Sequence, residues 1–208
     1  MNLKLKICGM KHSDNINEVV VLAPDYIGFI FYPKSKRYVG EQLDEQLVKS
    51  LRKIKKVGVF VNATLEEIVE KVKRYGLNYA QLHGDESAEF CKQIKGKGIS
   101  VIKAFQVDEA FDFKLLNAYK PYCEFFLFDT KSQGYGGAGK SFDWNILKKY
   151  DNEIPFFLGG GVGLENVNEI KKLSGLNIHA LDINSRFETE PALKDVQKIK
   201  EFITLVEL

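Results

Sequence analysis

A thiol and a carboxyl group, each at the end of an apolar stretch, are the side chains best suited to move protons. Cys8 ends the stretch 3–8, and Asp129 follows four consecutive apolar residues, 125–128. A thiolate can abstract a proton if the pKa of the thiol falls below its ordinary value of about 8.5. A carboxyl group leaving apolar surroundings should have a raised pKa, which suits a general acid. We therefore expect Cys8 to act as a base and Asp129 as an acid, the alternatives being a buried apolar thiol and a loop-capping carboxylate.

Three consecutive glycines, 159–161, indicate a site for an anion. Glycine exposes backbone N–H groups without obstruction, and a helix is expected to begin soon afterwards, near Leu164. The sequence also carries Asp182, Asn184 and Ser185 at the end of a later apolar stretch. We expect Gly160, Gly161 and these three residues to bind substrate, with a phosphate held by the glycines, Asn184 and Ser185. A tight turn that merely needs glycine is the alternative.

Three further side chains could contact a substrate. Arg37 is one of only four arginines, and arginine suits bidentate binding of a carboxylate. His83 could line the site or bond the backbone of its own loop. Lys103 could form a Schiff base, although a lysine in a strand more often pairs with a carboxylate.

Positioning these residues requires a repeating framework, and the sequence supplies one. Helical patterns alternate with short apolar stretches; for example, Thr64 and Glu67 form a capping box, a helix is expected to begin at 143–147, and 194–206 carries an apolar stripe. Eight strands are expected, at residues 3–8, 26–31, 56–61, 79–82, 100–105, 124–129, 155–158 and 180–183. Eight strand–helix units favour an α/β fold, a single-domain (β/α)8 TIM barrel with an eight-stranded parallel sheet over residues 1–208. An open doubly wound sheet is the alternative. In a barrel the site lies at the C-terminal ends of the strands.

Composition excludes several other functions. The chain has 208 residues with 30 Lys and Arg against 28 Asp and Glu, so no basic field favours nucleic acid. No apolar stretch is long enough for a membrane span, and the N-terminus reads as a strand rather than a signal peptide. The three cysteines form no disulfide or zinc pattern, which suggests a cytoplasmic protein. We expect no metal, because His12, His83 and His179 cannot converge, and no nicotinamide cofactor, because no dinucleotide-binding motif occurs.

Seven motifs occur together in one order along the chain. They are Lys6-Ile-Cys-Gly9, Val57-Gly-Val-Phe-Val-Asn62, Gln81-Leu-His-Gly-Asp85, Asp129-Thr130, Gly136-Gly-Ala-Gly-Lys140 with Phe142-Asp-Trp144, Gly159-Gly-Gly161 and Asp182-Ile-Asn-Ser185. In this the chain resembles the phosphoribosylanthranilate isomerase family of tryptophan biosynthesis. The resemblance implies an Amadori rearrangement of an aminoaldose phosphate without a cofactor, with Cys8 as base and Asp129 as acid. It also implies that Arg37 receives the anthranilate carboxylate.

The chain departs from the family pattern at three places. The loop Ser35-Lys36-Arg37 lacks a proline, Arg186 stands where glycine is common, and Ala192 stands where Pro-Gly is usual. Arg186 could add charge near the phosphate or point to solvent. Another phosphosugar isomerase barrel and a non-catalytic phosphosugar-binding protein are the alternative functions. The expected partner is a small-molecule substrate, the expected assembly is a monomer or a homodimer, and the glycine-rich loop 134–139 is a candidate for closure over substrate.

Overall fold

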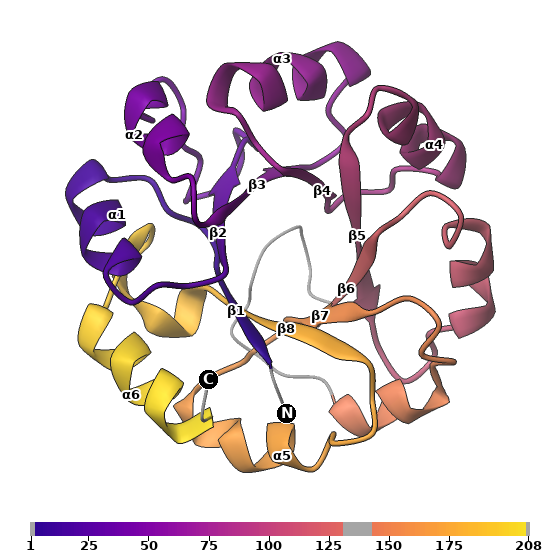
Figure 1. The fold of residues 1–208 in the computed structure, drawn as a ribbon. Coiled ribbons are helices and arrows are strands. Elements are labelled where there is room, and N and C mark those ends of the chain that lie inside the picture. Colours follow the sequence, from indigo (N-terminus) through magenta and orange to yellow (C-terminus); the bar gives the residue numbers. More distant parts are fainter. Residues whose placement is uncertain (1–2, 131–142, 207–208) are drawn as a thin grey trace.

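Eight parallel strands close into a barrel in chain order, as Figure 1 shows in a view into the barrel. The computed structural model describes residues 3–130 and 143–206. The strands are β1 (Lys4–Ile7), β2 (Tyr26–Ile30), β3 (Lys55–Phe60), β4 (Tyr79–Leu82), β5 (Ser100–Val107), β6 (Phe125–Thr130), β7 (Phe156–Leu158) and β8 (Ile178–Ile183). Strand β1 closes the barrel against β8, where Lys6 stands opposite Asp182. The predicted (β/α)8 barrel is confirmed.

The helices surround the barrel on its outside (Figure 1). They are α1 (Ser13–Val20), α2 (Glu45–Ser50), α3 (Leu65–Tyr75), α4 (Ala88–Gly96), α5 (Val167–Lys171) and α6 (Val196–Val206). The capping box predicted at Thr64 and Glu67 begins α3, and Gly76 ends it with a φ of 60°. Both signals act on backbone groups that the helix ends would otherwise leave unpaired.

Short 3₁₀ helices replace α-helices after two strands, contrary to the sequence-based expectation. They are η1 (Phe113–Ala118), which follows β5, and η2 (Trp144–Lys149), which precedes β7. The Asp143 side chain accepts from the Asn145 backbone N–H at 3.0 Å, so the acidic start was predicted correctly but the helix type was not. A 3₁₀ helix advances about 2.0 Å per residue against about 1.5 Å in an α-helix, so few residues cover the same path.

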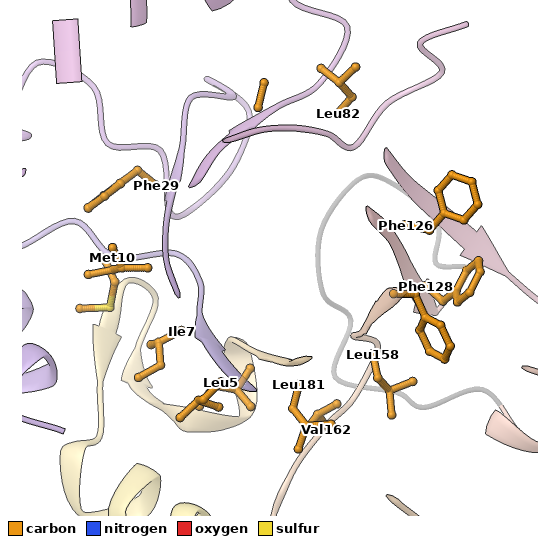
Figure 2. Packing of buried hydrophobic residues seen from close by; sticks show 14 of the residues in the cluster. Leu5, Ile7, Met10, Phe29, Leu82, Phe126, Phe128, Leu158, Val162 and Leu181 are labelled. Atoms are coloured by element: carbon orange, nitrogen blue, oxygen red, sulfur yellow. The ribbon is translucent and has the colours of Figure 1, made fainter. Parts of the chain in front are cut away.

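Two apolar layers lie on opposite sides of the strands because successive side chains alternate. The outer layer packs between strands and helices, and Figure 2 shows Leu5, Ile7, Phe126, Phe128 and other members of it. The inner layer fills the barrel with Tyr26, Val57, Tyr79, Ile102, Ala104, Phe125, Leu127, Phe157 and Ala180.

Aromatic rings close the N-terminal end of the barrel. The ring centroids of Tyr26 and Phe157 are 5.1 Å apart, and the Tyr26 hydroxyl lies 2.7 Å from His179 Nε2. His179 lies within β8 rather than before it, but at the end of the barrel that was expected. Space for a site therefore remains at the C-terminal ends of the strands.

A small hairpin after β8 was not predicted. Strand β9 (Glu188–Glu190) pairs antiparallel with β10 (Leu193–Lys194), following the 3₁₀ helix η4 (Ser185–Phe187). Ala192 in its turn has a φ of 72°, in the left-handed region that favours glycine. A glycine, which the family resemblance leads us to expect here, would adopt this conformation without strain. Among the residues described, no helix is long and apolar enough to cross a membrane.

Candidate active site

A cavity with about 730 Å³ of empty space, partly open to solvent, lies at the C-terminal ends of the strands. Eight of the nine predicted site residues line it: Cys8, His83, Asp129, Gly160, Gly161, Asp182, Asn184 and Ser185. Apolar side chains from β2 and β3, among them Ile30 and Val59, complete the wall next to Cys8. The topology thus brings together residues that lie up to 177 positions apart in the chain, from Cys8 to Ser185.

Cys8 directly follows β1 and is 4% exposed. Gly28 on β2 makes room for it, because a Cβ at that position would stand 2.8 Å from the Cys8 Sγ. Lys6 lies two residues earlier on the same inward face and is fully buried. Its Nζ is 2.8 Å from Asp182 Oδ1, so the thiol stands beside a buried ion pair.

Burial raises the pKa of the Cys8 thiol above its ordinary value. The Lys6 ammonium, which also hydrogen-bonds the thiol, acts in the opposite direction, and the Asp182 carboxylate adds to the rise. For Lys6 itself burial lowers the pKa, but Asp182 and Cys8 outweigh this effect and keep the amine protonated. Desolvation thus exceeds the attraction of the ammonium, so these surroundings alone do not lower the pKa of the thiol, which was the condition for a thiolate base.

His83 and Gln81 stand behind Asp129. The Asp129 Oδ1 accepts from the Thr130 backbone N–H at 2.8 Å, and His83 Nε2 is 3.2 Å from Asp129 Oδ2 without the alignment of a hydrogen bond. Gln81 Nε2 lies 2.9 Å from His83 Nδ1, which orients the ring. Of the two possibilities for His83, the structure favours the first, because the ring lines the cavity and faces the proposed acid.

The glycine loop follows β7 and faces β6. Gly160 and Gly161 have φ values of 71° and 81°, which favour glycine. A Cβ on Gly160 would stand 2.5 Å from the Thr130 backbone nitrogen. The helix that was to assist anion binding is short, since a 3₁₀ turn at Leu164–Asn166 (η3) precedes only the five residues of α5. The case for phosphate therefore depends on the exposed backbone of the glycines rather than on a helix dipole.

Asn184, Ser185 and Arg186 line the cavity after β8. Arg186 forms an ion pair with Glu165 at the start of η3, so its side chain turns toward the glycine loop rather than into open solvent. The Asn184 Oδ1 accepts from Lys194 Nζ at 2.7 Å. The 3₁₀ turn after β8 thus places the charged Arg186 side chain next to the loop that was expected to hold phosphate.

Arg37 is the one predicted site residue that is not on the cavity wall. Its Cδ lies over Gly9, where a Cβ would be 2.8 Å away, and Asn184 Oδ1 is equally close to that position. The guanidinium binds the Glu188 carboxylate through Nε at 2.8 Å and Nη2 at 2.6 Å. Arg37 therefore lies at the rim, already bound to a carboxylate of the protein.

Lys103 points away from the cavity, toward the helix layer. Its Nζ donates to the carbonyl oxygens of Leu82, Gly84 and Ala104 at 2.8–3.2 Å. It is also 3.2 Å from the buried Glu86 carboxylate. A Schiff-base role is therefore not supported.

Four polar residues of the site were not assigned a role from the sequence. Lys6 and Gln81 could have been found, because each is a polar residue at an inward position of an apolar strand. Glu188 and Lys194 lie on the hairpin that was not predicted. Within residues 3–130 and 143–206, no group of three His, Cys, Asp or Glu side chains could hold a metal ion. The glycine-rich loop 134–139 lies outside the described residues.

The fold and the cavity define a class of protein: a small (β/α)8-barrel enzyme whose cavity at the C-terminal ends of the strands is lined by a thiol, a carboxyl group and a glycine loop. A sequence profile described as N-(5'-phosphoribosyl)anthranilate (PRA) isomerase matches residues 5–205. The relative from Parabacteroides distasonis, named N-(5'-phosphoribosyl)anthranilate isomerase, is 47% identical over 201 residues, covering 96% of this chain and 91% of that relative.

Solved structures agree with the sequence comparisons. The crystal structure of phosphoribosyl anthranilate isomerase from Thermotoga maritima is 34% identical with a TM-score of 0.84, covering 99% of this chain and 98% of that one. A phosphoribosyl anthranilate isomerase solved with reduced 1-(o-carboxyphenylamino)-1-deoxyribulose 5-phosphate is 31% identical with a TM-score of 0.81, at the same coverage. The chain belongs to the N-(5'-phosphoribosyl)anthranilate isomerase family.

Proposed function

We propose that the protein converts N-(5'-phosphoribosyl)anthranilate into 1-(2-carboxyphenylamino)-1-deoxyribulose 5-phosphate, a step of tryptophan biosynthesis. The observation that carries this proposal is the shared cavity of Cys8 and Asp129, which also holds the glycine loop after β7. A base, an acid and an anion site are the groups that an aldose–ketose rearrangement of a phosphosugar needs.

Asp129 begins the reaction by donating a proton to the ring oxygen of the furanose. The bond between C1′ and that oxygen breaks, and the nitrogen lone pair forms a protonated Schiff base with C1′. The Cys8 thiolate then takes the proton from C2′. The C2′–H electrons form a C1′=C2′ double bond and the imine electrons return to nitrogen, giving an enolamine that tautomerises to the ketone. The protonated imine serves as the electron sink, so the residues present suffice.

The charges around Cys8 favour proton abstraction only after the Schiff base has formed on the substrate. Burial keeps the thiol protonated, while the Lys6 ammonium lowers its pKa in part. A second positive charge arises on the substrate when the Schiff base forms. Because a nearby positive charge favours the thiolate, Schiff-base formation promotes release of the Cys8 thiol proton to solvent at the open side of the cavity, and the resulting thiolate then accepts the proton from C2′.

The remaining residues bind the substrate in this proposal. The backbone of Gly160 and Gly161, together with Asn184 and Ser185, holds the phosphate, and Arg37 receives the anthranilate carboxylate. His83 lies beside Asp129 on the cavity wall, and Asp182 holds Lys6 next to the base. The three free cysteines are consistent with work in a reducing cytoplasm.

The proposal is tested by offering two aminoaldose phosphates, phosphoribosylanthranilate and the corresponding substrate of the histidine pathway. We expect conversion of the first, followed by chromatographic identification of the aminoketose. Conversion of the second alone would replace this proposal by another phosphosugar isomerase, and binding without conversion of either would favour a binding protein.

A further inference from the structure

A chain of three charged side chains connects the hairpin after β8 to the cavity rim. The Glu188 carboxylate binds the Arg37 guanidinium through two of its nitrogens, and Lys194 Nζ is 2.5 Å from Glu188 Oε1. The side chains of Arg37, Glu188 and Lys194 are 13%, 4% and 0% exposed. Removing three charges from water is costly, so their arrangement calls for an explanation beyond stability.

Both oxygens of Glu188 are held in place. Oε1 accepts from Arg37 Nε at 2.8 Å, from Lys194 and from the Ala192 backbone N–H at 3.1 Å. Oε2 accepts from Arg37 Nη2 at 2.6 Å. Lys194 is itself tied to Asn184 Oδ1 on the cavity wall at 2.7 Å. The carboxylate therefore cannot rotate without breaking contacts on three sides.

The geometry of the pair leaves part of Arg37 available. Glu188 occupies the edge formed by Nε and Nη2, while Nη1 has no hydrogen-bond partner among the described residues. A guanidinium has five N–H donors in one plane, so an arginine held by one carboxylate can bind a second one in that plane. The fixed plane would match the planar carboxylate of an aromatic acid.

We propose that Glu188, secured by Lys194, is a positioning residue that orients Arg37 and thereby makes the site selective for a substrate with a carboxylate on its aromatic amine. This inference rests on the proposed function and deepens it. Glu188 and Lys194 both lie on the β9–β10 hairpin, and the turn at Ala192 brings the two side chains together.

The charge of this cluster depends on pH. Burial lowers the pKa of Lys194 to about 8, although Glu188 raises it; Cys8 also raises it and Arg37 lowers it. The Glu188 pKa lies below its ordinary value because Arg37 and Lys194 outweigh the effect of burial. Below pH 8 the cluster therefore carries one net positive charge, which matches one carboxylate. Above pH 8 it approaches neutrality.

The test compares two inhibitors: the reduced product analogue and the same compound with phenyl in place of carboxyphenyl. Their inhibition constants are measured for the wild-type protein, for Glu188→Gln and for Glu190→Gln, an exposed residue of the same strand. We expect Glu188→Gln to weaken the carboxylate inhibitor by about tenfold or more, with the phenyl compound and Glu190→Gln nearly unchanged. Equal loss for both inhibitors would show a merely structural role, and tighter binding of the carboxylate would show that Glu188 competes with substrate; either result overturns the inference.

A second measurement needs no variant that could fail to fold. In the wild-type protein the ratio of the affinity for the carboxylate inhibitor to that for the phenyl compound should fall as pH rises from 7 to 9, because Lys194 loses its proton. A ratio independent of pH in the wild type would overturn the inference. If the wild type converts phosphoribosylanthranilate but the affinity ratio changes neither with Glu188→Gln nor with pH, only this inference fails. If the wild type neither converts the substrate nor binds the carboxylate inhibitor, the proposed function fails.

Discussion

Single residues decide the chemistry of this site through their immediate surroundings. Cys8 is a buried thiol with a raised pKa, and the ammonium of Lys6 next to it offsets only part of that rise. Gly28 gives the Sγ its space, and Asp182 neutralises Lys6. These surroundings favour the protonated form of the Cys8 thiol, because burial is the largest contribution to its pKa.

The raised pKa of Cys8 predicts a steep pH dependence of its alkylation. A thiol with a raised pKa keeps its proton to higher pH than an ordinary thiol, so the thiolate fraction is small at pH 7 and grows about tenfold per pH unit. The rate of modification by iodoacetamide, followed by mass spectrometry, should rise accordingly from pH 7 to 9. Cys8→Ser serves as the control for Cys91 and Cys123. Fast alkylation at pH 7 without a rise would contradict the assigned environment.

Sequence reasoning found residues whose type alone suggests chemistry and missed those that act through neighbours. Cys8 and Asp129 stood out because each ends an apolar strand. Lys6 became relevant only once β1 and β8 were seen to close the barrel and to place Asp182 opposite it. The partner of Arg37 could not be foreseen, because Glu188 lies 151 positions away in the chain.

At the scale of elements, loops between strands and helices carry the site, and their backbone conformation matters as much as their side chains. Strands were predicted to within about two residues at each end because apolar residues mark both faces of a parallel sheet. The hairpin β9–β10 was missed because Glu188, Thr189 and Glu190 show no apolar alternation. The 3₁₀ helices were missed because their sequence pattern resembles that of an α-helix.

Gly160→Ala tests the glycine loop. A Cβ there would stand 2.5 Å from the Thr130 nitrogen, and the φ of 71° is unfavourable for alanine. We expect a loss of about 1–3 kcal/mol in the free energy of unfolding and a clear rise in KM. Gly175→Ala is the control, because nothing lies within 4 Å of its added Cβ. Similar behaviour of the two variants in urea denaturation and kinetics would refute the role of the loop.

Ala192→Gly tests the turn of the hairpin. The φ of 72° strains alanine, so glycine should raise the free energy of unfolding by about 0.5–1 kcal/mol, despite its greater freedom in the unfolded chain. Thermal and urea unfolding measure this gain. Ala88→Gly, at the first residue of α4, should instead lower stability, by at most about 1 kcal/mol. A destabilised Ala192→Gly protein would mean that the turn is not strained.

At the scale of the whole molecule, the residues that stabilise the barrel and the residues that line the cavity lie at opposite ends of the barrel axis. The N-terminal ends of the strands are closed by packed aromatic rings, and the C-terminal ends surround the cavity. This division follows from the parallel sheet, which brings all strand ends of one kind to one side. The barrel could be predicted because each strand is marked by a local apolar stretch. The ion pairs Lys6–Asp182 and Arg37–Glu188 could not, because they join residues far apart in the chain. The expectation of a monomer or a homodimer stays a prediction, and the molar mass from light scattering would distinguish the two.

Phe157→Ala tests that separation. Phe157 is fully buried between Tyr26, Phe125 and His179, so its truncation should cost about 3–5 kcal/mol of stability. The kcat of the folded protein at low temperature should change little. Leu115→Ala, at a side chain 61% exposed, is the control and should cost at most about 0.5 kcal/mol. A large fall in kcat without loss of stability would contradict the division.

The central claim is that Cys8 and Asp129 transfer the protons of the phosphoribosylanthranilate rearrangement. Its most direct test is the loss of fluorescence of freshly prepared phosphoribosylanthranilate, with EDTA present, in the wild-type protein, Cys8→Ser and Asp129→Asn. We predict rapid turnover by the wild type and a loss of two or more orders of magnitude, about 3 kcal/mol or more, in each variant, while the reduced product analogue still binds. Full activity of either variant, or no turnover by a folded wild-type protein, would contradict the account.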